Sequence, residues 1–341
     1  MPTSNSLLPE WCRAYGTGLI HGLIKQTPKD FEVTENLDFV LSGEGEHDYL
    51  WIEKTGANTS WVARMLARHA GIAQRDVGYA GLKDRHAVTR QWFSVRRPSR
   101  LGTNWNELNI EGVEILEAGR HQRKLKRGAH AGNRFRIALR QVRTDGIDVP
   151  HRLEAIRAGG IPNYFGVQRF GRDANNLDMA ASVAAGKRLR RDTRGIVLSA
   201  ARSFLFNEIL SARVVDGSWN KALPNESLNL DGSGSVFVAH EIDEVIVQRV
   251  ADLDVHPTGA LWGEVATDTE GAAAILERTV TEKYPEYVAC LRGARMKPAR
   301  RPLRAVVRNL DWQIEGTDIY LEFALDRGSF ATAVLRELVA Q

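Results

Sequence analysis

An isolated acid in a strongly basic segment is the first feature of this sequence that suggests chemistry. Asp84 lies between Lys83 and Arg85 in the stretch YAGLKDRHAVTRQWFSV. Between residues 81 and 100 there are six Lys or Arg residues and that one carboxylate. Nearby cations favour the ionised form of an Asp and lower its pKa. Asp84 is therefore either an ordinary surface ion-pair partner or a carboxylate kept ionised for chemistry on a polyanion.

Three other short stretches carry residues that suit the handling of an unpaired base. Phe31 lies inside the charged stretch TPKDFEVTE, and Phe330 comes at a turn before a helical pattern. Asn133 and Phe135 are two apart in GNRFRI, so they share one face of a predicted strand. Aromatic rings stack on bases, and an Asn amide can read a pyrimidine edge. Taken singly, each is also compatible with an ordinary core aromatic or turn Asn.

Motifs for other chemistry are missing from the sequence. It contains no GxxxxGK[ST] loop, no GxGxxG motif, no HExxH and no cysteine cluster at metal-ligand spacing. The acidic stretch AHEIDE, residues 239–244, fits a polar surface segment better than a metal site. We therefore expect neither a metal nor a nucleotide cofactor.

Basic residues gather in runs although the net charge is only +4. Residues 120–140 contain eight Lys or Arg and no acid, residues 187–194 contain five and one acid, and residues 292–304 contain six and no acid. One such run is typical of a solvated loop. Four basic segments in one chain, counting residues 81–100, indicate a surface for nucleic acid, because neutralised phosphates release their counterions.

Composition also indicates the compartment. Cys12 and Cys290 lie far apart and are expected to be reduced thiols. No run approaches the ~18 apolar residues of a membrane span, and the N-terminus lacks a basic region followed by an apolar core. These features predict a cytoplasmic protein without membrane association.

The pattern of apolar residues predicts an α+β fold with an interruption. At 341 residues, the chain is long enough for two domains or for one domain with a large insertion. Alternating residues predict strands at both ends of the chain, and helical patterns dominate from about 160 to 302. A last helix, with Ser329 as its N-cap, completes the chain. We therefore expect one domain from residues 1–158 and 303–341, interrupted by an insertion domain at 159–302.

Six stretches together resemble the motifs of one family. In chain order they are TPKDFEVTE, GLKDRHAVTRQWFSV, HAGNRFRI, IPNYFGVQRFG, RSFLFNEILSARV and GSFATAVLREL. They resemble the motifs of the tRNA pseudouridine synthase D (TruD) family. The resemblance implies a pseudouridine-synthase core built on a mixed, largely antiparallel sheet. It also implies a TruD-specific α/β insertion domain, and a V-shaped molecule with a basic cleft. The implied reaction is the cofactor-free isomerisation of uridine to pseudouridine in tRNA, at position 13 in bacterial members.

The resemblance also implies roles for individual residues. Asp84 matches the catalytic aspartate. Phe31, Asn133 and Phe330 match positions that contact the substrate, and Phe135 resembles the aromatic residue that replaces the tyrosine of other pseudouridine synthases. Lys25 matches the basic partner of the aspartate.

Three functions are weighed on this basis. The leading hypothesis is a monomeric tRNA pseudouridine synthase in which the Asp84 carboxylate either adds to C1′ or removes a sugar proton; the sequence leaves both open. The second is a non-catalytic tRNA-binding protein or chaperone that uses the same basic surface. The third, a metal-dependent nuclease, requires clustered acids that the sequence does not show.

Overall fold

The computed structural model describes residues 8–17, 19–97, 102–265 and 269–340. Within these ranges the chain forms a nine-stranded sheet, a four-stranded sheet and a two-stranded pair. The large sheet has the order β14-β15-β7-β2-β5-β3-β6, with β1 added beside β7 and β4 beside β5. All its pairings are antiparallel except that of β2 with β5. The fold is α+β with a mixed, largely antiparallel sheet, as predicted.

The strands of the large sheet come from both ends of the chain. They are β1 (His21–Ile24), β2 (Phe31–Leu37), β3 (His47–Thr55), β4 (Val77–Tyr79), β5 (Val88–Arg96), β6 (Val113–His121), β7 (His130–Arg143), β14 (Arg308–Glu315) and β15 (Asp318–Asp326).

Alternation along these strands builds the core, because successive side chains in a strand point to opposite faces. On β2, Phe31 and Val33 are buried, and on β7 the buried residues include Phe135 and Ile137. Three helices pack with this sheet: α1 (Thr59–His69), α2 (Val149–Gly159) and α8 (Ala331–Arg336).

A second lobe contains most of the helices. Its four-stranded sheet is antiparallel throughout, in the order β10-β9-β11-β12. The lobe consists of α3 (Asn175–Ala184), α4 (Arg191–Val215), β9 (Glu226–Leu230), β10 (Val236–Ala239), α5 (Glu244–Ala251), β11 (Val255–Leu261), α6 (Gly271–Thr281), α7 (Pro285–Gly293) and β12 (Ala299–Pro302). The long helix α4 lies at its centre, packed on α3, α6, α7 and β11.

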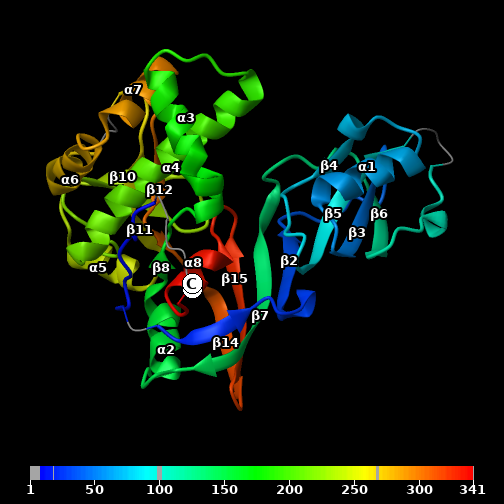
Figure 1. The fold of residues 1–341 in the computed structure, drawn as a ribbon, viewed down its shortest axis with the longest axis horizontal. Helices are drawn as coiled ribbons and strands as arrows, with labels where there is room; N and C mark the ends of the chain where they lie inside the picture. The colour runs from blue at the N-terminus through cyan, green and yellow to red at the C-terminus, as the bar shows by residue number, and fades with distance from the viewer. Residues whose placement is uncertain (1–7, 18, 98–101, 266–268, 341) are drawn as a thin grey trace.

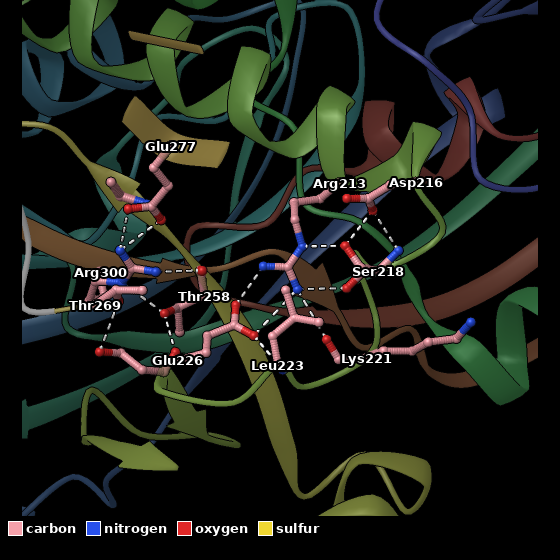
Figure 2. Close-up of polar contacts among 12 residues, drawn as sticks. Arg213, Asp216, Ser218, Lys221, Leu223, Glu226, Thr258, Thr269, Glu277 and Arg300 are labelled. Carbon is pink, nitrogen blue, oxygen red and sulfur yellow. Dashed lines mark hydrogen bonds and ion pairs between the residues drawn. The ribbon is translucent and has the colours of Figure 1, made fainter. Parts of the chain in front are cut away.

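Two buried arginines hold the second sheet to its helices. Arg213, at the end of α4, pairs with Glu226 of β9 at 2.7 Å (Figure 2). Arg300 of β12 pairs with Glu277 of α6 at 2.8 Å. A buried charge is costly unless it is paired and hydrogen-bonded. Each pair therefore fixes one helix of the lobe against one strand of its sheet.

In Figure 1 the part of the large sheet with β3, β5 and β6, together with α1, diverges from the second, helical lobe, and β7 and β15 lie between the two. A short pair of β8 (Ile161–Pro162) and β13 (Arg304–Ala305) stands where the chain enters and leaves the helical lobe. Arg308 of β14 donates to Asp231, in the helical lobe, at 2.6 Å and to Asp326 at 2.8 Å. This bridge links the second lobe to the end of β15. The proposed domain boundaries at 158/159 and 302/303 stay predictions.

One detail of the predicted fold is wrong. The N-cap of α8 is Phe330, in extended conformation and without a side-chain capping bond, rather than Ser329. The reason lies in the preceding turn, where the Ser329 amide donates to Asp326 O at 3.2 Å.

Both cysteines are free. Among the described residues, no helix combines the length and apolar character that crossing a membrane requires.

Candidate active site

Asp84 lies in the loop between β4 and β5, close to the beginning of β2. The position follows from the sheet, because β5 runs parallel to β2 with Val88 opposite Glu32. In a parallel pair the segments that precede the two strands lie at the same edge. Residues just before β2 and residues just before β5 are thus brought together although they are distant in sequence.

Two groups hold the Asp84 carboxylate. Lys25 Nζ forms an ion pair with Oδ2, and the backbone amide of His86 donates to Oδ1 at 2.9 Å. The side chains of Asp84 and Lys25 are 33% and 30% exposed, so the carboxylate is open to a ligand and not sealed in the core. Lys25 has a φ of 59°, an uncommon value for a residue with a side chain, and its Nζ lies 4.1 Å from the centre of the Phe31 ring.

These contacts keep Asp84 ionised. Burial acts to raise the pKa of its carboxyl, but the hydrogen bonds from Lys25 and the His86 amide, with the Lys25 charge, outweigh it. The pKa therefore lies below the usual Asp value. At neutral pH the group is an anion beside a cation, which suits a nucleophile or a base.

Three further charged residues, Lys54, Lys83 and Glu35, hold the Asp84 loop from the interior of the protein. Lys54 Nζ, fully buried, donates to the backbone O of Asp84 at 2.8 Å, and burial lowers the pKa of Lys54 to about 8. Lys83 Nζ forms a buried ion pair with Glu35 Oε2 at 2.7 Å. Lys83 thus points into the protein, whereas the side chain of its neighbour Asp84 is partly exposed.

Phe31, Asn133 and Phe135 lie on one face of the sheet. Val33 is opposite Phe135 and Glu35 is opposite Asn133 in the β2–β7 ladder, so these side chains share the face on which Phe31 also lies. The rings of Phe31 and Phe135 are 6.2 Å apart edge to face. Asn133 Oδ1 is buried and has no hydrogen-bond partner among the described residues. Such an atom is costly in a folded protein, and it offers an acceptor to a bound ligand.

Phe330 lies apart from Asp84, at the junction with the helical lobe. Its ring is half-buried and lies 6.5 Å from that of Phe165. The segment before it pairs with β7, where Leu325 is opposite Asn133 and the Arg327 amide donates to Ala131 O at 2.9 Å. The structure therefore places Lys25 in contact with both Asp84 and Phe31. It sets Asn133 and Phe135 on the same face as Phe31, and Phe330 just beyond the end of the β7–β15 ladder at which Asn133 lies.

Sequence reasoning missed Glu35 and Lys54. A signal existed for both, because Glu35 continues the alternation of Phe31 and Val33, and Lys54 continues that of Leu50 and Ile52. A charged residue on an apolar face is expected to have a buried partner.

The basic runs differ in how many of their charges are paired. In the run 120–140, Arg134 and Arg136 contact Glu322, and Arg140 pairs with Asp30 and Asp318, so part of this run is structural. The run 187–194, by contrast, precedes and begins α4 with exposed cations and no ion pair among the described residues. Arg100 lies outside the described residues. In the part of the chain that the structure describes, no group of three or more His, Cys, Asp or Glu residues could hold a metal ion.

A family model described as tRNA pseudouridine synthase D (TruD) matches residues 12–180 and 174–338, which together span nearly the whole chain. The chain belongs to the TruD family. Two TruD-family relatives are a tRNA pseudouridine synthase D of Pseudomonas syringae pv. syringae and one of Methylococcus capsulatus. The first is 48% identical over 330 residues, covering 96% of this chain and 94% of the relative; the second is 46% identical over 332 residues, covering 96% and 93%.

A solved structure agrees with the fold. A Methanosarcina mazei chain, also described as a TruD protein, superimposes with a TM-score of 0.70 and covers 97% of this chain and 96% of its own length. At 19% identity, this similarity bears on the fold alone.

Proposed function

We propose that this TruD-family chain isomerises uridine to pseudouridine in tRNA, with Asp84 as the catalytic carboxylate. The observation that carries the proposal is the state of Asp84. It is ionised by Lys25 and the His86 amide and is one-third exposed, and the Lys25 ammonium that holds it also lies over the Phe31 ring. Membership of a family of tRNA pseudouridine synthases supplies the reaction.

The reaction needs a base outside its stack. The N1–C1′ bond of uridine breaks, the uracil turns, C5 bonds to C1′, and C5 loses its proton while N1 gains one. No atom is gained or lost overall, so no cofactor is required. Because these atoms are inaccessible within a stacked helix, the target nucleoside must swing out to reach Asp84.

Asp84 opens the reaction in one of two ways. Its carboxylate adds to C1′ as the glycosidic bond breaks, or it takes a proton from the sugar. Both require an anion, which the low pKa of Asp84 provides at neutral pH. Lys25 has a positioning role in either case, because its ammonium holds one carboxylate oxygen.

The detached uracil must be held while it turns. In this proposal the unpartnered Oδ1 of Asn133 accepts the uracil N3–H, and Phe31 and Phe135 form the apolar wall of the site. Such a wall also keeps water from the reacting sugar carbon, where hydrolysis competes. Phe330 contributes the substrate contact on the side of the helical lobe.

Binding of the remaining tRNA falls to the cations of both lobes. We infer that residues 159–302 form an insertion domain between the halves 1–158 and 303–341, and that tRNA contacts both domains. Phosphate contacts position the RNA without reading its sequence. All six proposed site residues come from one chain, so a monomer suffices. The family resemblance indicates position 13 as the target.

The deciding experiment compares Asp84→Asn and Asp84→Ala with the unaltered chain. Purified protein is incubated with tRNA, pseudouridine is mapped by carbodiimide modification, and tRNA affinity is measured in parallel. We expect binding to persist and isomerisation to fall by at least about 10³-fold, since a group that acts on the reacting atoms is lost. Asp311→Asn, an exposed acid on β14, is the matched control. Full turnover by Asp84→Ala rejects the role of Asp84, and tRNA binding by the unaltered chain without any pseudouridine favours a non-catalytic tRNA-binding protein.

A further inference from the structure

Three half-buried arginines in the helical lobe have no acidic partner. They are Arg169, which follows β8, Arg202 on α4 and Arg301 on β12. Arg169 donates to Ser199 Oγ, Arg202 to two backbone carbonyls, and Arg301 to Asn163 and the carbonyl of Gly328. None of them forms an ion pair with a described residue. Half-buried cations normally have a counter-charge, because removing them from water is costly.

Arg169 and Arg301 lie against the ring of Phe165, and Arg202 is placed near them by its position on α4. The guanidinium carbons of Arg301 and Arg169 lie 4.2 and 5.3 Å from the centre of the Phe165 ring, so the two like charges are less than about 10 Å apart. Phe206 contacts both Phe165 and Arg301. Arg202 lies one helical turn before Phe206 on the same side of α4.

The hydrogen-bonding capacity of this cluster is not used up. Nε of Arg202 and Nε of Arg301 are two of the six buried side-chain polar atoms without a partner among the described residues. Burial lowers the pKa of all three arginines, and that of Arg301 to about 9. They remain protonated at neutral pH, so the cluster carries positive charge that no described carboxylate neutralises.

Arg300, the neighbour of Arg301, has a carboxylate partner, as is expected of an arginine with a structural role. Arg300 precedes Arg301 and points to the other face of β12, where it pairs with Glu277 at 2.8 Å (Figure 2). The same strand therefore carries a neutralised arginine on one face and an arginine without a carboxylate on the other. Unlike Arg300, Arg301 therefore keeps its positive charge for an anion from outside the chain.

The cluster adjoins the Phe330 loop. Arg301 Nη2 donates to the carbonyl of Gly328 at 2.8 Å, and Phe165 lies beside Phe330. An anion bound here is therefore next to a residue of the candidate active site. The anion that an RNA presents is its phosphodiester group, and guanidinium groups match phosphate oxygens in charge and geometry.

We propose that Arg169, Arg202 and Arg301 bind a backbone phosphate of the RNA substrate, beside the nucleoside that Phe330 contacts. The proposal rests on the proposed function for its choice of RNA as the occupant. It gives the helical lobe a specific task, which is to anchor the RNA strand next to the Asp84 site.

The test replaces each arginine by glutamine and measures tRNA affinity over a range of salt concentrations, with thermal unfolding in parallel. Each variant is expected to bind tRNA about tenfold more weakly, with a salt dependence shallower by about one charge. Its melting temperature stays level or rises, because an uncompensated cation has been removed. The control is Arg278→Gln, which is expected to leave affinity unchanged. Arg278 is an exposed arginine on α6 whose one hydrogen-bond acceptor in the described part of the chain is Ala274 O.

Unchanged tRNA affinity and salt slope in all three variants overturn the proposal. A loss of melting temperature without a change in the salt slope overturns it too, because that result marks a structural role. A second arm uses inorganic phosphate, which raises the melting temperature if it binds the folded chain. Stabilisation by phosphate that Arg301→Gln abolishes, together with unchanged tRNA affinity, assigns the site to free phosphate and also rejects the proposal.

Failure of this inference is distinguishable from failure of the proposed function. A chain that binds tRNA through these arginines but leaves every uridine unchanged supports the phosphate site and rejects the synthase. A chain that forms pseudouridine with Asp84, while all three arginine variants bind tRNA with unchanged affinity, supports the synthase and rejects the phosphate site.

Discussion

The ion pair of Lys25 and Asp84 joins two segments that are 59 positions apart in the sequence. It exists because each residue precedes one strand of the only parallel pair in the described part of the large sheet, β2 and β5. An antiparallel arrangement of these strands would place the two residues at opposite edges. The parallel step in an otherwise antiparallel sheet is thus what assembles the candidate site.

Lys25→Met is expected to move the acid limb of the pH–rate profile upward. Asp84 has a lowered pKa, so it stays ionised as the pH falls towards 4. Without the Lys25 ammonium, its hydrogen bond and its charge no longer lower the pKa of Asp84, so the pKa rises and activity is lost at a higher pH. The measurement is kcat/KM for tRNA between pH 4 and 9, and Lys25→Arg, which keeps the charge, serves as the control. An acid limb at the same pH in Lys25→Met contradicts this role of Lys25.

Lys54→Met is expected to remove a pH-dependent part of the stability. In the folded chain Lys54 releases its proton near pH 8, whereas an exposed Lys keeps it to about pH 10.5. The unfolded chain then binds more protons between these values, so this residue makes stability rise with pH there. Relative to Lys54→Met, the unaltered chain should gain about 2–3 kcal/mol from pH 7 to 10. Urea unfolding at several pH values checks this, and a constant difference between the two proteins rejects it.

Glu35→Ala is expected to destabilise the fold by about 3–5 kcal/mol, because it leaves the buried ammonium of Lys83 without its partner. The loop that carries Asp84 begins at this anchor, so activity falls as well. Urea denaturation measures the change in the free energy of unfolding. Glu10→Gln, in which an 84% exposed carboxylate is removed from its pair with Arg13, should change stability by no more than about 1 kcal/mol. Equal effects of the two substitutions argue against an anchoring role for Glu35.

Asn133→Leu is expected to separate activity from stability. It removes a buried oxygen that has no partner in the free protein, so the free energy of unfolding stays level or rises by about 1 kcal/mol. Loss of the contact to uracil lowers kcat/KM by about 10²-fold or more. Thermal unfolding and pseudouridine formation are measured on the same preparation. A stable variant with full activity excludes Asn133 from uracil recognition.

Local patterns predicted much of the fold, because alternation and helical periodicity are properties of neighbouring residues. The strands around Phe31, Phe93 and Phe135, and the helix α1, follow from such patterns. The contact of Lys25 with Asp84 depends on the direction in which two strands pair, which no local pattern encodes. For the same reason the arginine cluster was not predicted. Arg301 lies in the basic run 292–304, but Arg169 and Arg202 lie outside every basic run, since a loop, a helix and a strand contribute one member each. The cap at Ser329 was predicted wrongly because the turn after β15 uses its amide.

The pairing of β7 with β15 has a consequence for folding during synthesis on the ribosome. Residues 132–139 pair with residues 319–326, so one edge of β7 stays open until that later segment has left the ribosome. A chain truncated before residue 318 has the Asp84 loop but lacks Phe330. Under the proposed function, such a chain would not form pseudouridine.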